Sequence, residues 1–487
     1  MSKAARVREA NAEKNRLKRE REEFEAKKRK VRKITAIITV SLILVLVLLT
    51  FIGTMVYNAR MNSGEYLRSE IAASSRNIDV NGAMMNYYFN DVYNTFVDYY
   101  GSYVSYYGLD TTQSTKGQEF SDGESWFAYF MSGAESNVSG ILALNEAAAA
   151  NGVSLSEDET EAVRIRADYT DEALYGRGVN SDDIYDAKLL EALAYKYQFM
   201  KQDEFAPSVS EINTRYNENP ARYQSVDFLA YDFSWSDGTL TQEEAEAAAN
   251  ELADAKGVDA FKAALGELIL AESPELTEDE LSEEIELYLL TGSVYSEGNE
   301  LSEWAFGGAE VGDTIIITDD SYSRYIVYLL VSEPTRDENA TANVRHILFS
   351  DSVWGSEEAA LVQAKKVLAE FQSGDMSEEA FAALALAYSE DEGSYYHGGL
   401  YDNIVEGQMI TEFNDWCFDP SRKPGDVEII TTTFGYHIMY YSGEGLPAWQ
   451  ASVSDDIISE RFEEYGNEIA EEYTVLFDDR VLNMIPG

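Results

Sequence analysis

An uncharged apolar run near the N-terminus constrains this chain more than any other feature. The run is ITAIITVSLILVLVLLTFIGTMVY, Ile34 to Tyr57, 24 residues without a charged side chain. A helix of this length is about 36 Å long, which suffices to cross a hydrocarbon layer of about 30 Å with some tilt. The basic segment KKRKVRK (27–33) directly precedes it, and this charge predicts an N-terminus in the cytoplasm. We therefore expect a basic cytoplasmic tail at 1–33 and a transmembrane signal anchor at 34–57.

Two other readings of the apolar run fit less well. It is longer than the hydrophobic part of a typical cleaved signal peptide, and no small-residue cleavage site follows it closely. A lipoprotein anchor needs a cysteine just after the run, but the single cysteine of the chain is Cys417. One cysteine also excludes an intramolecular disulfide framework. The sequence therefore favours a retained single-pass anchor.

Charge divides the chain at the same place. Residues 1–33 contain 14 Lys/Arg and 6 Asp/Glu, a net charge of +8, which leaves −59 for the rest of a chain whose formal charge is −51. So acidic a surface repels nucleic acid and anionic lipid headgroups, and we expect neither as its partner. It favours solubility and cationic or unfolded protein partners outside the cytoplasm.

The remaining chain is long enough for several domains. Gly64 to Asn77 is expected to be a polar stalk, and residues 58–205 as a whole are predicted to form a mainly helical domain. Residues 206–334 and 335–445 contain alternating strand and helix patterns, and 446–487 is expected to be a C-terminal helix that runs from Trp449 to Leu482. The predicted fold class is α+β.

Residues 206–334 and 335–445 also resemble each other as a divergent repeat. VDFLAYDFSW (226–235) corresponds to VRHILFSDSVW (344–354), and an Ala/Glu-rich helical stretch follows each. LSEWAF, VGDTIII and SRYIVYLL in the first copy then correspond to FNDWCF, PGDVEII and GYHIMYY in the second. In this alignment Phe228 takes the place of His346, and Arg324 or Tyr325 that of His437.

All three histidines of the chain, His346, His397 and His437, lie in the second copy. His346 is in its first predicted strand and His437 in its last. These two strands can be neighbours in a small sheet, so the two imidazoles can face each other. His397 precedes a Gly-Gly turn and is expected to be exposed, whereas Cys417 between two aromatic residues is expected in the core.

Several motifs of the second copy, in this order and spacing, resemble one known family. They are VRHILF, FAALALAYSEDEGS, GG, EGQMITEF and FGYHI, between about Asn343 and Ser442. This segment resembles the parvulin-type peptidyl-prolyl cis/trans isomerases. The whole plan, with an anchor, a helical region and two such units, is similar to extracytoplasmic foldases of the PrsA/SurA type.

The resemblance implies a compact β-α-α-α-β-α-β-β domain, preceded here by a degenerate copy at 206–334. It implies a buried polar cluster beneath an apolar proline pocket, and it implies no cofactor and no metal. Two departures from the family pattern, GGLYDN after His397 and the longer DPSRKPGD (419–426), concern loop shape and substrate preference. The site residues that it implies are, for catalysis, His346, Asp391, Thr432 and His437 and, for substrate binding, Met409, Phe413 and Phe434.

Two readings of the residues themselves compete with a catalytic one. A buried histidine is more often a satisfied core residue, and Met409 and Phe413, four residues apart, are ordinarily core residues on one helical face. Three histidines with Asp391 could also bind zinc, but no local spacing of the H-E-x-x-H kind supports it.

The resemblance implies an enzyme that speeds cis/trans isomerisation of X–Pro bonds in unfolded secreted or surface proteins, tethered to the membrane through one helix. A holdase chaperone that only binds through its parvulin-like domains is the alternative. A scaffold that binds through the tyrosine-rich segment 87–108 is a third reading, although such spacing is more often a helix core. The formation of a homodimer stays open.

Overall fold

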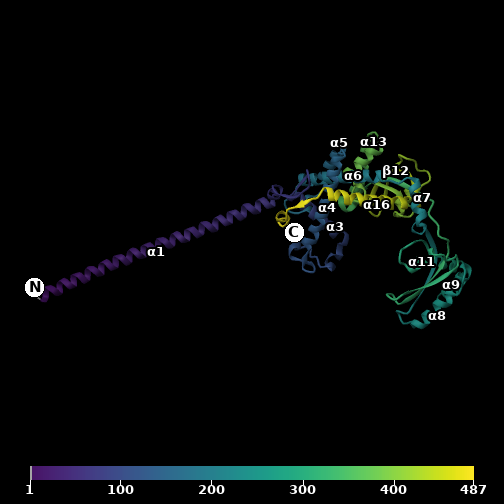
Figure 1. Cartoon of the computed structure of the whole chain (residues 1–487), viewed down its shortest axis with the longest axis horizontal. Coiled ribbons are helices and arrows are strands. Elements are labelled where there is room, and N and C mark those ends of the chain that lie inside the picture. Colours follow the sequence, from purple (N-terminus) through teal and green to yellow (C-terminus); the bar gives the residue numbers. More distant parts are fainter. Residues whose placement is uncertain (1–2) are drawn as a thin grey trace. The chain divides into compact units, whose positions relative to one another are not determined.

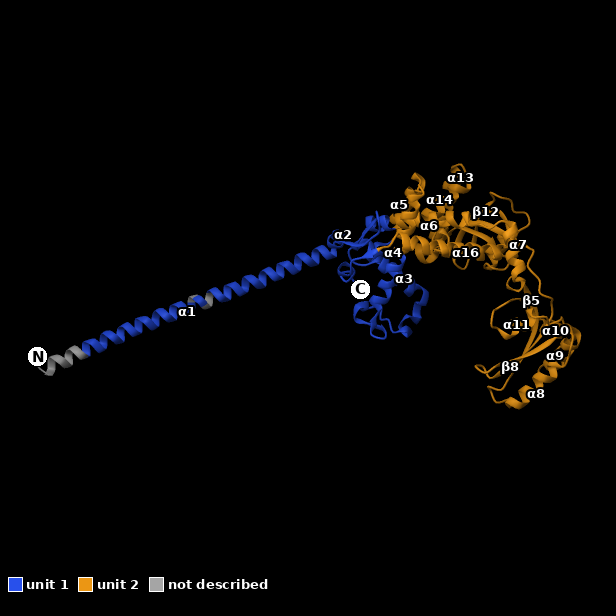
Figure 2. Ribbon diagram, viewed as in Figure 1, with its two compact units in different colours: residues 1–138, 171–187, 476–487 blue, residues 139–170, 188–475 orange. Residues whose placement is uncertain are grey.

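The structure is a computed structural model that describes residues 3–487, with the side chains of 3–10, 34, 36 and 37 left out. The chain, shown in Figure 1, divides into two compact units, which Figure 2 shows in blue and orange. Unit 1 contains residues 1–138, 171–187 and 476–487, and unit 2 contains residues 139–170 and 188–475. Helices and antiparallel sheets occur together, which confirms the α+β class.

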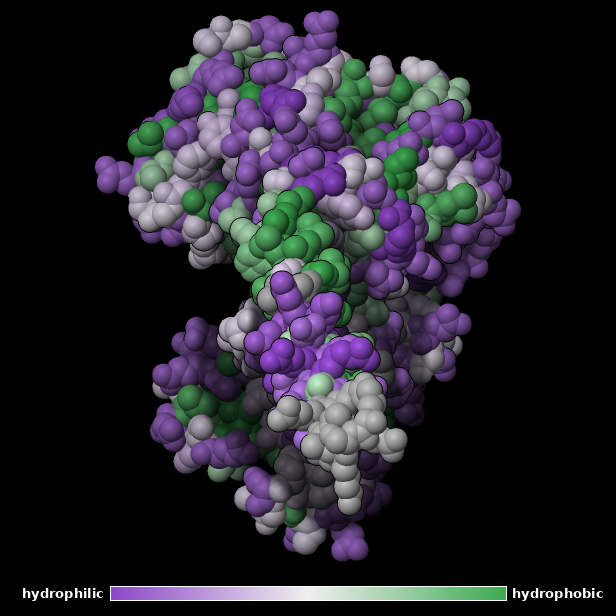
Figure 3. All heavy atoms as spheres, turned by 90° about the vertical axis from the view of Figure 1, so that its left-hand side faces the viewer, coloured by the Kyte–Doolittle hydropathy of each residue, from purple (hydrophilic) through white to green (hydrophobic). Residues whose placement is uncertain are grey.

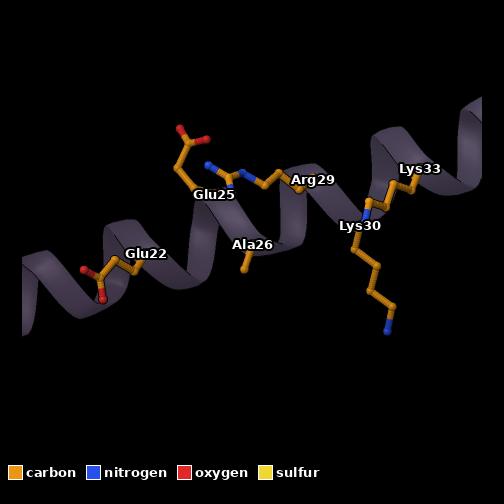
Figure 4. Close-up of a pocket in the computed structure, with 6 residues that line it drawn as sticks. All are labelled: Glu22, Glu25, Ala26, Arg29, Lys30 and Lys33. Atoms are coloured by element: carbon orange, nitrogen blue, oxygen red, sulfur yellow. The ribbon is translucent and has the colours of Figure 1, made fainter.

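The apolar run lies within one uninterrupted helix, α1 (Lys3–Asn62). Among the described residues, α1 is the helix that is long and apolar enough to span a membrane. Figure 3, which faces the N-terminal end of α1, shows a green hydrophobic band beyond purple charged residues. The side chains just before the run, such as Glu22, Arg29 and Lys30, project from the exposed helix, and the shallow hollow between them is lined by α1 alone (Figure 4).

The segment that follows α1 is not the expected polar stalk. Residues 65–81 form α2 (Glu65–Arg68), β1 (Ile71–Ser74) and β2 (Asp79–Asn81), and Leu67 and Ala72 are fully buried. β1 pairs with β2 on one side and with β13 (Leu476–Phe477) on the other. The stalk prediction was wrong because β1 and β2 are short and one of the two pairing partners of β1, β13, lies some 400 residues further along the chain.

The tyrosine-rich segment divides into a buried and an exposed part. In α3 (Gly82–Tyr100) Tyr87, Tyr88 and Phe89 are buried, as expected of a helix core. Tyr99 and Tyr106 are exposed by 81% and 86%, so the core interpretation fails for the second half. The other elements of unit 1 are η1 (Gly101–Tyr107), η2 (Thr115–Gly117), β3 (Glu119–Ser121), β4 (Glu124–Ser125), η3 (Glu172–Tyr175) and α17 (Asp479–Leu482), with the first parts of α4 (Trp126–Ala150) and α6 (Ser181–Glu204).

Unit 2 contains two four-stranded antiparallel sheets with helices packed on them. Several of its helices begin with a capping box, in which a Ser or Thr and the Glu three residues later satisfy each other's backbone N–H groups, as Ser156 and Glu159 do in α5. Its first sheet and helices are α5 (Glu157–Tyr169), α7 (Val209–Glu218), η4 (Pro220–Tyr223), β5 (Ser225–Ser234), α8 (Gln242–Ala253), α9 (Val258–Glu272), α10 (Glu278–Glu286), β6 (Leu289–Val294), α11 (Glu300–Phe306), β7 (Thr314–Asp319) and β8 (Arg324–Leu330).

The second sheet of unit 2 has a helix layer on each face. Ile347, Phe349 and Ile438 pack on one face against α13 and α14, and Val344 and Met439 pack on the other against α15. Its elements are β9 (Ala340–Phe349), α12 (Asp351–Trp354), α13 (Glu357–Ser373), α14 (Glu378–Tyr388), η5 (Tyr395–His397), β10 (Leu400–Ile404), α15 (Thr411–Cys417), β11 (Val427–Thr432) and β12 (Gly435–Pro447), followed by α16 (Ala448–Glu472).

The two sheets share one topology. Their strand orders are β6-β5-β8-β7 and β10-β9-β12-β11, which is second-first-fourth-third in both. Leu330 bonds to the backbone of Gly312 and Asp313 as Tyr441 bonds to that of Gly425 and Asp426, which makes Leu330 and Tyr441 equivalent. Their strand partners, Phe228 and Val344, are then equivalent too.

This register corrects the alignment derived from the sequence. Counting two residues along the first strand from Phe228 and Val344 places Ala230 at the position of His346. In the last strand Ile326 stands at the position of His437. The expected equivalents, Phe228 and Arg324 or Tyr325, are therefore wrong by one or two residues.

The C-terminal segment is helical only in its first part. α16 ends at Glu472, before the predicted end at Leu482. The chain continues as the strand β13 and the short helix α17, so residues 473–487 are not part of a long helix.

Candidate active site

Two imidazoles meet on the central strands of the second sheet. β9 and β12 are antiparallel neighbours, with His346 opposite Met439 and His437 opposite Leu348. Both histidines therefore lie on the sheet face that α15 covers. Their Nδ1 atoms are 3.0 Å apart, and the residues are only 3% and 5% exposed.

Hydrogen bonds extend from this pair to a carboxylate at one end and a hydroxyl at the other. Asp391 Oδ2 lies 2.8 Å from His346 Nε2, and Thr432 Oγ1 lies 2.9 Å from His437 Nε2. Because an ionised carboxylate only accepts, His346 donates through Nε2 and, when neutral, accepts through Nδ1. His437 must then donate through Nδ1 and accept a hydrogen bond from the Thr432 hydroxyl at Nε2. All three hydrogen bonds are therefore donated in the same direction, from Thr432 toward Asp391.

Asp391, at one end of this row of hydrogen bonds, is stabilised in its charged form. Burial opposes the ionisation of Asp391, but the hydrogen bond and charge of His346, with the hydroxyls of Ser394 and Tyr401, outweigh burial and lower its pKa to about 2. Tyr401 donates to Oδ2 at 3.1 Å, and Ser394 donates to the same oxygen. Sequence reasoning missed both partners. The Asp-x-x-Ser spacing within a turn was the available signal for Ser394.

The other end of the pair is held neutral. Burial, followed by the neighbouring His346, lowers the pKa of His437 to about 3. A neutral imidazole with both nitrogens engaged is neither a free base nor a nucleophile. The cluster therefore provides a fixed polar surface, with the half-buried carboxylate of Asp391 at its far end.

An aromatic wall borders this polar surface. Phe413, in α15 and 4% exposed, presents its ring at 84° to His346 and 85° to His437, with centroids 5.4 and 5.7 Å away. Met409 packs in the same apolar cluster, but it precedes α15, so it is not one helical turn before Phe413 as expected. Phe434 lies in the β11–β12 turn, where its N–H donates to Thr432 Oγ1. Phe434 is 60% exposed.

Two further sequence expectations have different outcomes. Cys417 is buried, as expected of a core residue, and burial raises the pKa of its thiol to about 12. His397 was expected to be exposed, and this expectation is wrong. Its ring stacks on Phe199 with centroids 3.8 Å apart, and burial lowers its pKa. Among the residues described by the structure, no group of three or more His, Cys, Asp or Glu is arranged to hold a metal ion.

Known proteins resemble this chain most clearly around the histidine pair. The sequence model of the family described as PPIC-type PPIASE domain matches residues 327–442. Chaperone SurA of Pseudomonas syringae is 34% identical over 109 residues, which cover 22% of this chain and 23% of SurA. Foldase protein PrsA of Halalkalibacterium halodurans is 25% identical over 257 residues, which cover 46% of this chain and 72% of that foldase.

Shorter matches occur among other foldases. Foldase protein PrsA 3 of Bacillus anthracis is 39% identical over 80 residues, 16% of this chain and 28% of the foldase. The chain thus matches only about a quarter of the length of SurA and of this foldase. The crystal structure of the Bacillus anthracis peptidylprolyl isomerase PrsA, 17% identical, aligns over 57% of this chain and 94% of that chain with a TM-score of 0.20.

Proposed function

Residues 327–442 are a PPIC-type PPIase domain in a chain homologous to PrsA foldases and SurA chaperones, and from this premise we propose that the protein catalyses cis/trans isomerisation of X–Pro bonds in unfolded secreted or surface proteins. The supporting observation is the pair of buried imidazoles, 3.0 Å apart, beneath the aromatic edge of Phe413. His346, His437, Asp391 and Thr432 are the proposed catalytic residues.

Rotation about a peptide bond faces a barrier of about 18–20 kcal/mol, and uncatalysed X–Pro exchange takes tens to hundreds of seconds. The twisted amide has less charge separation than the planar one, so a site with little water favours it. We assign Met409, Phe413 and Phe434 to the binding of the proline ring, which leaves the carbonyl side free to swing over the polar surface. Catalysis is then tighter binding of the twisted amide than of the planar one, with no covalent step.

A protease-coupled assay on a prolyl peptide, with the full chain in detergent micelles, tests this proposal. We expect His346→Ala and His437→Ala to lower kcat/KM at least about tenfold, equal to about 1.4 kcal/mol of transition-state stabilisation. Ile326→Ala, at the equivalent position of the first sheet, is the matched control and should retain activity. Folded wild-type protein without turnover would overturn the assignment and leave the alternative, a holdase.

The same variants separate holding from isomerisation. We propose that the helical region 58–205, with α16, holds unfolded clients, and that the domain at 206–334 is a tandem relative of the isomerase that has lost its site. Ala230 and Ile326 in place of the two histidines support the second statement. Suppression of client aggregation should then survive His437→Ala. If wild type fails to slow aggregation, no holding function remains.

We further propose a single-pass membrane protein with a cytoplasmic N-terminal tail and its remaining chain outside the cytoplasm. The continuous helix α1, with a basic segment before its apolar run, supports this arrangement.

A further inference from the structure

Arg166 lies outside the PPIC-type domain, yet its guanidinium binds the segment that carries Asp391. Arg166 is in the last turn of α5, and α14 packs against this helix. Its Nε donates to Leu386 O at 2.6 Å, and its Nη2 donates to Ser389 O at 2.6 Å and to Ala385 O at 3.4 Å. These carbonyls lie at the C-terminal end of α14, where the helix dipole favours a cation, and that of Ala385 also accepts the N–H of Ser389 at 2.9 Å.

The same guanidinium also contacts Tyr395, four residues after Asp391. Its central carbon lies 3.7 Å from the ring centroid of Tyr395, within the range of a cation–π interaction. Arg166 therefore contacts both Ser389 and Tyr395, which lie on either side of Asp391 in the chain. The planar fork of an arginine suits this combination of several acceptors and an aromatic face, which a lysine cannot reproduce.

Ser389 and Tyr395 in turn hold the backbone of Asp391. The Ser389 hydroxyl accepts the N–H of Asp391 at 3.3 Å and that of Leu348, in β9, at 3.1 Å. The carbonyl of Asp391 accepts the N–H groups of Ser394 at 3.2 Å and Tyr395 at 3.0 Å. Ser389 is fully buried and Tyr395 only 8% exposed, so the loop is fixed by packing as well as by hydrogen bonds.

Helix α6 supports the continuation of this loop. Tyr195 stacks on Tyr396 with centroids 4.6 Å apart, and Phe199 stacks on His397. The Tyr396 hydroxyl donates to Glu191, which is 7% exposed. Residues from two helices that precede the PPIC-type domain thus cover the loop from Ser389 to His397.

We propose that Arg166 is a positioning residue of the isomerase, which acts through Ser389 and Tyr395 to hold Asp391 against His346. This rests on the proposed function of the histidine site. Loss of the guanidinium removes contacts on both sides of Asp391. A carboxylate displaced by about 1 Å no longer holds the Nε2–H of His346 in place. A misplacement of this size can reduce activity up to about a hundredfold.

The test uses the full chain in detergent micelles with ¹⁵N-labelled histidine, because the sequence has only three histidines to resolve. In Arg166→Leu we expect a tenfold or greater fall in kcat/KM for the prolyl peptide and shifted ¹⁵N signals of His346 and His437. Arg166→Lys should restore little of either. Millimolar guanidinium should partly restore both in Arg166→Ala.

Tyr169→Leu is the matched control. Tyr169 is also in α5 and contacts Trp354 and Tyr388, so its loss weakens packing beside Arg166 without removing the guanidinium. It should lower stability and leave the imidazole signals unchanged. Folded Arg166→Leu with wild-type signals would overturn the proposal. Wild-type protein that is inactive, but whose imidazole signals respond to Arg166→Leu, would instead refute the isomerase function and retain the positioning role.

Discussion

Protonation of His437 couples the candidate site to folding. Burial and the neighbouring His346 lower the pKa of His437 to about 3, whereas a histidine in the unfolded chain has a pKa of about 6.5. As pH falls below about 6.5 the unfolded chain takes up a proton that the folded site refuses, so stability is lost progressively between about pH 6.5 and about pH 3. We expect this group to cost about 2 kcal/mol at pH 5 relative to pH 7.5.

Urea unfolding of wild type and His437→Gln at both pH values measures this cost. The glutamine variant lacks the titration, so the loss of stability between pH 7.5 and 5 should be smaller in the variant by the stated amount. The carboxylates of the chain titrate in both proteins, and their effect on stability cancels in the difference. Equal losses in the two proteins would mean that His437 keeps the pKa of a solvated histidine in the folded protein.

Individual residues could be predicted from the sequence where a motif carried them. His346, His437, Asp391 and Thr432 were proposed from the resemblance, and the structure brings the four together in one hydrogen-bonded chain. Their catalytic roles remain a prediction. The partial burial of His397 could not be predicted, because the ring that stacks on it belongs to Phe199, almost 200 residues earlier.

At the scale of elements, the turn between α14 and β10 depends on a glycine. Gly399 has φ +74°, and its carbonyl accepts the N–H of His346 at 2.8 Å. A Cβ on Gly399 would lie 2.2 Å from the carbonyl oxygen of His346, in the strand that carries the site. Gly399→Ala therefore adds a backbone clash to the cost of a left-handed conformation, about 1–2 kcal/mol.

Gly407 offers a matched comparison for this prediction. Its φ is +86°, but a Cβ there meets nothing within 4 Å. We expect Gly399→Ala to destabilise unit 2 at least about 2 kcal/mol more than Gly407→Ala, as overpacking of a rigid core does. Denaturant unfolding of both variants measures the difference. Similar free energies of unfolding would show that β9 yields to the added methyl group.

The elements also explain why the alignment of the two sheets was shifted. Side chains of a strand alternate between faces, so a shift by two residues leaves the apolar pattern of a strand unchanged. Phe228 thus appeared equivalent to His346, and only the backbone pairing of Leu330 and Tyr441 places Ala230 there. β1 was missed for a different reason, because β1 and its neighbour β2, with four and three residues, are too short to show a periodic pattern.

At the scale of the whole molecule, the sequence predicted the order of structural regions better than their limits. The long helix α1, a mainly helical region and two four-stranded sheets with their helices occur in this order along the chain. The C-terminal limit failed because β13 returns to pair with β1 in unit 1. Pairing between the two ends of a chain leaves no local signal in either segment.

The last prediction concerns the proposed membrane anchor at residues 34–57. If residues 34–57 remain in the membrane, an epitope tag on residue 1 should stay on the mature chain and resist external protease in intact bacterial cells until they are permeabilised. A tag at the C-terminus should be digested in protoplasts without permeabilisation. Residues 58–487 alone, directed outside by a cleavable signal, should be released from the membrane. Loss of the N-terminal tag from the mature protein would identify the apolar run as a cleaved signal, and digestion of that tag in intact cells would reverse the topology expected from the basic segment at 27–33.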